Sequence, residues 1–169
     1  GPAIGQVALV GSDYHGLKPT MAVREGDRVK LGQLLFSDKK NQLAKFVAPA
    51  TGVISAINRG ERRVFQSLVI DIEGVEQQQS LPTFDASTLQ NLGRDNVRDH
   101  LVNTGHWISL RTRPYSKIPT IDSVANSIFV TAMDTNPLSA DPIVVIENRR
   151  DDFANGLKVL TNLTDGPVN

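Results

Sequence analysis

The stretch Arg24-Glu-Gly-Asp-Arg-Val-Lys-Leu-Gly-Gln-Leu-Leu-Phe-Ser-Asp-Lys-Lys40, followed by Phe46-Val-Ala-Pro-Ala-Thr-Gly-Val-Ile54, decides how the first part of the chain folds. Its apolar runs are short, and glycine, proline or a polar turn closes each of them. The same pattern extends outward to Val7–Val10 and to Leu68–Ile72. Short strands with such punctuation are typical of a small barrel or sandwich rather than of a βαβ unit. We therefore expect a β-rich domain over residues 3–75.

The pattern changes after Gly74. Residues 76–84 hold three consecutive glutamines and then Leu81-Pro82, which predicts an exposed linker. Beyond it, apolar residues at helical spacing predict a helix over residues 94–104, with Gly105 in the position of a C-terminal cap.

Three further segments complete the second part. The apolar runs Ile128–Ala132 and Ile143–Ile146 predict strands. Residues 151–163 repeat apolar side chains at helical spacing and begin with Asp151 and Asp152, which suit the electropositive end of a helix. Residues 85–169 are thus expected to form an incomplete α/β domain, which makes the whole chain a mixed α+β protein.

Composition narrows the class of function. The chain has 169 residues, of which 40% are hydrophobic and 21% charged, values close to those of globular proteins. Its 18 basic and 18 acidic residues balance, so generic nucleic-acid binding is disfavoured. The absence of cysteine excludes disulfides, cysteine zinc sites and cysteine-ligated clusters.

The chain carries no sign of membrane insertion or export. No apolar run approaches the ~18 residues that a transmembrane helix needs, and the N-terminus lacks the layout of a signal peptide. Gly1-Pro2 resembles the scar left by tag removal and there is no initiator methionine, so residues 1–2 are interpreted as such a scar on an excised piece of a longer protein.

A cationic loop follows the first predicted helix. Arg111, Arg113 and Lys117 lie close together, and no acidic residue occurs between Asp99 and Asp122. Prolines at 114 and 119 forbid a helix there, so the cations lie on an extended segment that also carries Tyr115. This loop is either a solvated connection or a site for an anionic or quinonoid group or for an acidic partner.

A second candidate segment reads Tyr14-His-Gly-Leu-Lys-Pro19. Its aromatic ring, imidazole (His15) and cation (Lys18) near a turn suit a quinone head group, although a structured loop explains the same residues. The three histidines, 15, 100 and 106, are too scattered to predict a metal site. No segment predicts a catalytic residue.

The β part resembles the hammerhead of biotinyl and lipoyl domains, in which paired strands present a lysine at a hairpin tip. On that resemblance Lys39 would be the carrier lysine. Two adjacent lysines, Lys39 and Lys40, and a longer tip depart from the usual turn. An ordinary charged hairpin on a barrel-sandwich scaffold explains them equally.

Four features of the chain belong together: the hammerhead, Asn58-Arg-Gly-Glu-Arg-Arg-Val-Phe-Gln-Ser-Leu-Val-Ile70, the loop from Leu110 to Asp122, and Val130-Thr-Ala-Met-Asp-Thr-Asn-Pro-Leu-Ser-Ala-Asp-Pro142. In combination they resemble the NqrA family, the A subunits of the bacterial Na+-translocating NADH:quinone reductases. The resemblance implies a barrel-sandwich hybrid domain and a hydrophilic subunit, peripheral on the cytoplasmic face of the inner membrane. Its complex uses NADH, ubiquinone, flavins, iron–sulfur and Na+, its partners are the other subunits, and this chain would have a quinone-proximal or assembly role. Relative to the family, a first strand and a large C-terminal region are expected to be missing, and the chain alone is expected to be inactive.

The second part is also similar to the flavin-binding domain of respiratory complex I and of the C subunit of Rnf. In those relatives the loop after the helix is rich in glycine, which lets backbone amides approach a flavin phosphate. Here the loop Leu110–Pro114 contains no glycine, so we expect the FMN site to be lost and no cofactor to be bound. Three hypotheses stay open: an accessory subunit near the quinone, a flavin- and NADH-binding module like that of Rnf, and a lipoyl or biotinyl carrier.

Overall fold

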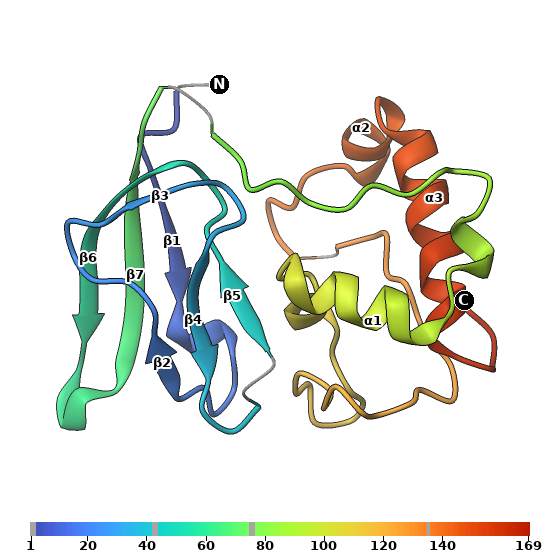
Figure 1. Cartoon of the computed structure of the whole chain (residues 1–169), viewed down its shortest axis with the longest axis horizontal. Coiled ribbons are helices and arrows are strands. Elements are labelled where there is room, and N and C mark those ends of the chain that lie inside the picture. Colours follow the sequence, from blue (N-terminus) through green and yellow to red (C-terminus); the bar gives the residue numbers. More distant parts are fainter. Residues whose placement is uncertain (1–2, 42–43, 75–76, 135) are drawn as a thin grey trace. The chain divides into compact units, whose positions relative to one another are not determined.

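The structure, a computed structural model, describes residues 3–41, 44–74, 77–134 and 136–169 (Figure 1). The chain forms two compact units, Gly1–Leu81 with Leu101–Ile121 and Pro82–His100 with Asp122–Asn169. The expected tag scar, Gly1 and Pro2, lies outside the described residues.

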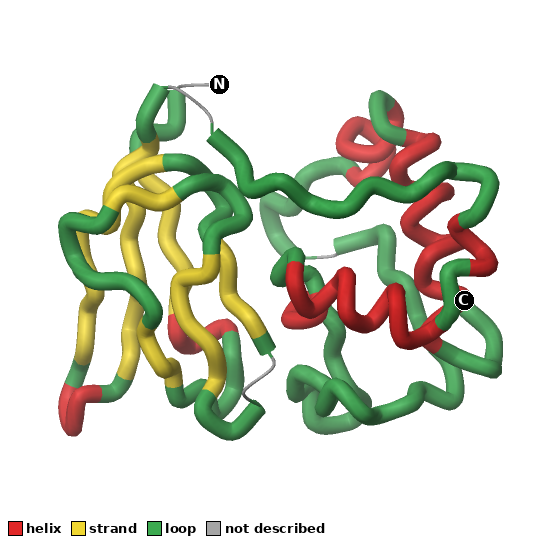
Figure 2. The backbone as a smooth tube through the Cα atoms, in the orientation of Figure 1, coloured by secondary structure: helices red, strands yellow, loops and turns green. Residues whose placement is uncertain are grey.

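The first unit contains two antiparallel sheets, whose strands are yellow in Figure 2. One sheet has the order β1-β7-β6-β3 and the other the order β2-β4-β5. The strands are β1 (Gln6–Val10), β2 (Pro19–Met21), β3 (Arg28–Val29), β4 (Leu34–Asp38), β5 (Lys45–Val47), β6 (Gly52–Arg59) and β7 (Phe65–Ile72). Two 3-10 turns, η1 (Gly11–Asp13) and η2 (Glu61–Arg63), follow β1 and β6. All named pairings are antiparallel, which confirms the expected β-rich unit without a βαβ crossover.

Alternating side chains of both sheets form one core. In β7 the buried positions are Phe65, Leu68 and Ile70, whereas Gln66 is exposed. Phe36 of β4 is completely buried in the same cluster. Burial of a large apolar side chain stabilises a fold by roughly 1.5–3 kcal/mol, so this cluster is the main source of stability for the first unit.

Residues 101–121 pack on the β unit, although the sequence predicted a boundary at residues 76–84. Trp107, in the 3-10 turn η4 (Trp107–Ser109), is buried, and its indole N–H donates to the carbonyl of Pro119 at 3.0 Å. Ile108 and Ile118 pack against the β core. The apolar side chains of this segment therefore find their partners in the first unit.

The regular elements described in the second unit are helices, which are red in Figure 2 and are joined by long loops. It contains α1 up to His100, together with α2, α3 and two 3-10 turns. The bounds are α1 (Arg94–Asn103), α2 (Pro142–Glu147), α3 (Arg150–Leu160), η3 (Leu89–Asn91) and η5 (Thr161–Leu163). The helices predicted over 94–104 and 151–163 are confirmed.

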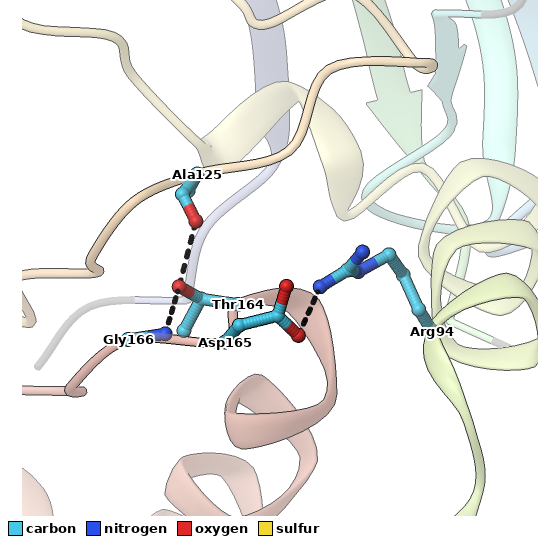
Figure 3. A network of polar contacts seen from close by, with 5 residues as sticks. All are labelled: Arg94, Ala125, Thr164, Asp165 and Gly166. Atoms are coloured by element: carbon cyan, nitrogen blue, oxygen red, sulfur yellow. Dashed lines mark hydrogen bonds and ion pairs between the residues drawn. The ribbon is translucent and has the colours of Figure 1, made fainter.

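Polar contacts hold the end of the chain to earlier segments of the second unit. Figure 3 shows Arg94 of α1 paired with Asp165 at 2.9 Å. The neighbouring Thr164 hydroxyl donates to the carbonyl of Ala125 at 2.7 Å and accepts from the backbone N–H of Gly166 at 3.0 Å. These bonds connect residues far apart in sequence.

The strand predicted over residues 143–146 is wrong, because this run lies in helix α2. The carboxylate of Asp141 accepts the N–H of Ile143 at 2.9 Å, and Pro142 occupies the first helical turn. Both features start helices. The apolar side chains of α2 stay largely exposed, so local capping, and not burial in a sheet, decides its conformation.

The strand predicted over residues 128–132 is also wrong. Ile128 forms only an isolated parallel bridge with Val168. The N–H of Ile128 donates to the carbonyl of Pro167, and the N–H of Val130 donates to the carbonyl of Asn169. Extended backbone becomes a strand only when it pairs with a neighbouring segment. In the part of the chain that the structure describes, the neighbour of residues 128–130 is the short segment 167–169.

Gly105 offers a test of how residues 101–121 pack. Its φ is +76°, and an added Cβ would lie 2.5 Å from Cγ2 of Val47, a stiff side chain. Gly26, in the same unit, has φ +88° and nothing near an added Cβ. Gly26→Ala should cost about 1 kcal/mol of backbone strain, whereas Gly105→Ala should cost about 2–4 kcal/mol because a clash adds to it. Urea unfolding of both variants measures the difference, and equal losses would contradict the packing of Gly105 on β5.

Candidate functional site

Tyr14 follows the turn η1 and is fixed by the core beneath it. Its backbone N–H donates to the carbonyl of Gly11 at 3.3 Å, and its carbonyl accepts from Leu17 at 3.1 Å. Its ring meets the ring of Phe46 edge-on at 4.8 Å between centroids. The phenol is half-buried, so its position is set by packing as well as by the turn.

Arg111 lies over this ring. Its guanidinium carbon is 5.5 Å from the centroid of Tyr14, within the range of a cation–π interaction. The guanidinium also donates to the carbonyls of Ile108 and Leu110, the latter at 3.0 Å. Two segments that the sequence singled out separately therefore meet in one pair.

The environment of Tyr14 keeps its phenol neutral. Burial raises the pKa of Tyr14 above its ordinary value, the positive charge of Arg111 partly opposes this rise, and the negative charge of Asp13 adds to it. At neutral pH the hydroxyl therefore carries its proton and is able to donate a hydrogen bond.

A mainly apolar pocket of about 510 Å³ adjoins Tyr14 within the first unit. The walls come from β1, from residues 31–32 and 47–49, and from residues 78–81 and 104–108. Polar groups on its wall include Tyr14 and His106, whose Nδ1 lies 2.9 Å from the hydroxyl of Thr104. An apolar cavity with a few polar groups is the usual form of a site for a small organic ligand.

The other predicted residues lie on the same unit but outside the Tyr14–Arg111 pair. The ammonium of Lys117 is 5.8 Å from the ring centroid of Tyr115. Their loop is closed by hydrogen bonds from the N–H of Thr112 to the carbonyl of Lys117 and from the N–H of Ser116 to that of Thr112, both 2.8 Å. His15, Lys18 and Arg113 are exposed and belong to neither pair.

Lys39 lies at the tip that joins β4 to β5, as the hammerhead resemblance implied. Its backbone N–H donates to the carbonyl of Lys18 at 2.8 Å. The carboxylate of Asp38 accepts the N–H groups of Lys18 and Lys40, each at 3.2 Å. The tip is thus held to the segment before β2, and a carrier role for Lys39 stays a prediction.

Sequence reasoning missed much of the pocket. It rejected His106 as a metal ligand and gave it no place in a pocket, and it treated Leu9, Val47 and Leu31 only as strand or turn residues. The sole local signal was Gly105, whose missing side chain lets residues 104–108 approach β5. Among the described residues, no group of three or more His, Asp or Glu side chains is arranged to hold a metal ion. No described helix is long and apolar enough to cross a bilayer.

Two family models match the chain. The model of the NqrA N-terminal barrel-sandwich hybrid domain matches residues 1–73, and that of the NqrA second alpha/beta domain matches residues 92–169. The chain belongs to the NqrA family. The expected fold class, a barrel-sandwich hybrid domain followed by an α/β domain, is thereby confirmed.

Relatives from several bacteria share both domains. The chain is 60% identical over 168 residues to the A subunit of the Na(+)-translocating NADH-quinone reductase of Saccharophagus degradans, and 58% identical over the same length to the protein of that name from Hahella chejuensis. The relative from Shewanella frigidimarina is 54% identical. Each match covers 99% of this chain, and the chain spans only 37–38% of the length of these relatives.

The Tyr14–Arg111 pair predicts a change in titration. In a Tyr115→Phe background Tyr14 is the single tyrosine. Arg111→Gln removes the charge that opposes the effect of burial, so the pKa of Tyr14 should rise further, whereas Arg113→Gln should leave it unchanged. The absorbance of tyrosinate during an alkaline titration measures both. A fall, or an equal rise in both variants, would show that Arg111 does not act on Tyr14.

Proposed function

We propose that this chain is part of the A subunit of a Na+-translocating NADH:quinone reductase and binds the quinone head group in the pocket beside Tyr14. The family membership and the names of the relatives support the first half. The apolar pocket lined by Tyr14, over whose ring Arg111 lies, is the observation that carries the second half.

The pocket suits a quinone in chemical terms. A quinone head group is a neutral ring with two carbonyl oxygens, and it carries an apolar tail. Apolar walls hold the ring, while the protonated phenol of Tyr14 and the imidazole of His106 are potential donors to a carbonyl oxygen. Arg111 lies over the ring of Tyr14 and brings a positive charge near the pocket, which would oppose the carboxylate of Asp13 on the pocket wall and favour the negative charge that a quinone gains on reduction.

The role is one of binding and assembly within the complex. In this proposal NADH oxidation, quinone reduction and Na+ transport are coupled by the assembled subunits, and the flavins and iron–sulfur centres lie on other chains. This chain lies at the cytoplasmic face of the inner membrane beside its partner subunits.

Binding can be followed through Trp107, the single tryptophan, because its neighbours His106 and Ile108 line the pocket. A short-chain ubiquinone should quench its fluorescence. Tyr14→Phe should raise the apparent Kd about three- to tenfold, because it removes one hydrogen bond to the quinone. Tyr115→Phe is the matched control and should bind like the unchanged protein.

Two results would contradict this site. One is an absence of quenching at quinone concentrations that saturate the assembled reductase. The other is an equal loss of affinity in Tyr14→Phe and Tyr115→Phe, which would place the quinone away from the pocket.

The loop gives a separate prediction in the assembled complex. Replacing Arg111 and Arg113 together by alanine should cost about 1–2 kcal/mol of stability, because Arg111 loses its contact with Tyr14 and its hydrogen bonds to two carbonyls, whereas Arg113 is exposed. The same change should weaken the association of the subunits or quinone turnover. Co-purification and turnover assays of the complex measure these effects. Normal assembly with unchanged turnover would show that the loop is only a solvated connection.

A further inference from the structure

The turns at one end of the first unit carry most of its positive charge. The segments 11–18, 38–41 with 44–45, 59–64 and 111–117 hold ten of the 18 Lys and Arg residues but only three of the 18 Asp and Glu residues. The rest of the chain holds eight Lys and Arg residues and fifteen Asp and Glu residues. A chain with zero formal charge is therefore strongly polarised, and we call these four segments the basic end.

Strand pairing places three of these segments together. Val10, at the end of β1, pairs with Ser67 near the start of β7, which the turn 60–64 connects to β6. Pro19, at the start of β2, pairs with Asp38 at the end of β4. The hairpins after β4 and β6 lie at the same, lower end of the first unit in Figure 1.

The fourth segment joins the same end through side chains. Arg111 lies over the ring of Tyr14, and the amide of Asn41 donates to the carbonyl of Pro119 at 3.2 Å. The turn of residues 111–117 therefore adds its cations to those of the hairpin tip.

Among the described residues, no ion pair neutralises the cations of the basic end. Nine of its ten cationic residues are exposed, Lys45 being half-buried. The ion pairs found among the described residues use Arg28, Arg94 and Arg98, all outside the basic end. Its carboxylate Asp38 accepts only backbone N–H groups in the contacts described. Clustered cations without carboxylate partners create a local field that attracts an anionic surface.

Exposed apolar side chains lie among these cations. Val64, next to Arg63 in the β6–β7 hairpin, is 62% exposed, and Tyr115, between Arg113 and Lys117, is 75% exposed. Aromatic and apolar tips flanked by Lys and Arg are typical of segments that enter the headgroup region of a bilayer. An acidic protein partner would use the cations but gives no reason for both apolar tips.

We propose that the basic end docks on the surface of an anionic phospholipid bilayer. Clusters of four to eight Lys or Arg residues at a membrane surface bind anionic headgroups, and this end exceeds that number. The inference stands independently of the quinone site, because Lys39 and Lys40 do not line the pocket.

Vesicle co-sedimentation tests the proposal. The protein should bind vesicles of equal parts phosphatidylcholine and phosphatidylglycerol at low salt and dissociate from them at high salt. It should not bind vesicles of phosphatidylcholine alone. Lys39→Gln with Lys40→Gln should weaken binding about 25-fold, since each lysine near such a surface contributes roughly fivefold. Arg24→Gln with Lys30→Gln, an equal loss of charge outside the basic end, should change binding less than about twofold.

Three results would overturn the proposal. Failure to bind the anionic vesicles is the first, and an equal loss in both double variants is the second. The third is capture by immobilised polyglutamate without binding to vesicles, which would assign the basic end to an acidic protein. Circular dichroism checks that both double variants fold. Quinone titration of Lys39→Gln with Lys40→Gln should give an unchanged Kd, which separates the loss of lipid binding from any damage to the pocket.

Discussion

A row of aromatic contacts connects the core of the first unit to its candidate site. Phe65 of β7 meets Phe36 of β4 at 5.2 Å, and Phe36 stacks on Phe46 of β5 at 4.6 Å. Phe46 in turn meets Tyr14, over which Arg111 lies. Each aromatic pair contributes about 0.5–1.5 kcal/mol beyond the burial of its area. The same rings that hold the two sheets together thus fix the direction of the phenol, so the site depends on the core and not on its own loop alone.

Local signals in the sequence predicted the elements that local physics decides. The helix of residues 94–103 follows from apolar spacing and from Gly105, and the hairpins follow from their Gly and Pro turns. The same logic failed at residues 143–146, where β-branched side chains suggested a strand. A single carboxylate cap at Asp141 and a proline in the first turn outweighed that preference.

The candidate site was only partly predictable. Tyr14 and Arg111 were each singled out by residue type, but nothing local shows that they touch, because their contact depends on how residues 101–121 pack on the sheets. The pocket beside them was missed for the same reason: its walls are mostly apolar residues from separate segments of the first unit, which form a cavity only once the chain has folded.

The two units are interleaved along the chain, since each is made of two separate stretches and the polypeptide passes from one unit to the other at residues 81–82, 100–101 and 121–122. During synthesis the first unit therefore stays unfinished until residue 121 has left the ribosome, although its strands are complete at residue 72. Dissection of the gene at the linker of residues 76–84 would sever the β unit from Ile108 and Ile118, whose side chains pack against its core. The smallest piece that keeps this unit whole is the continuous stretch through residue 121.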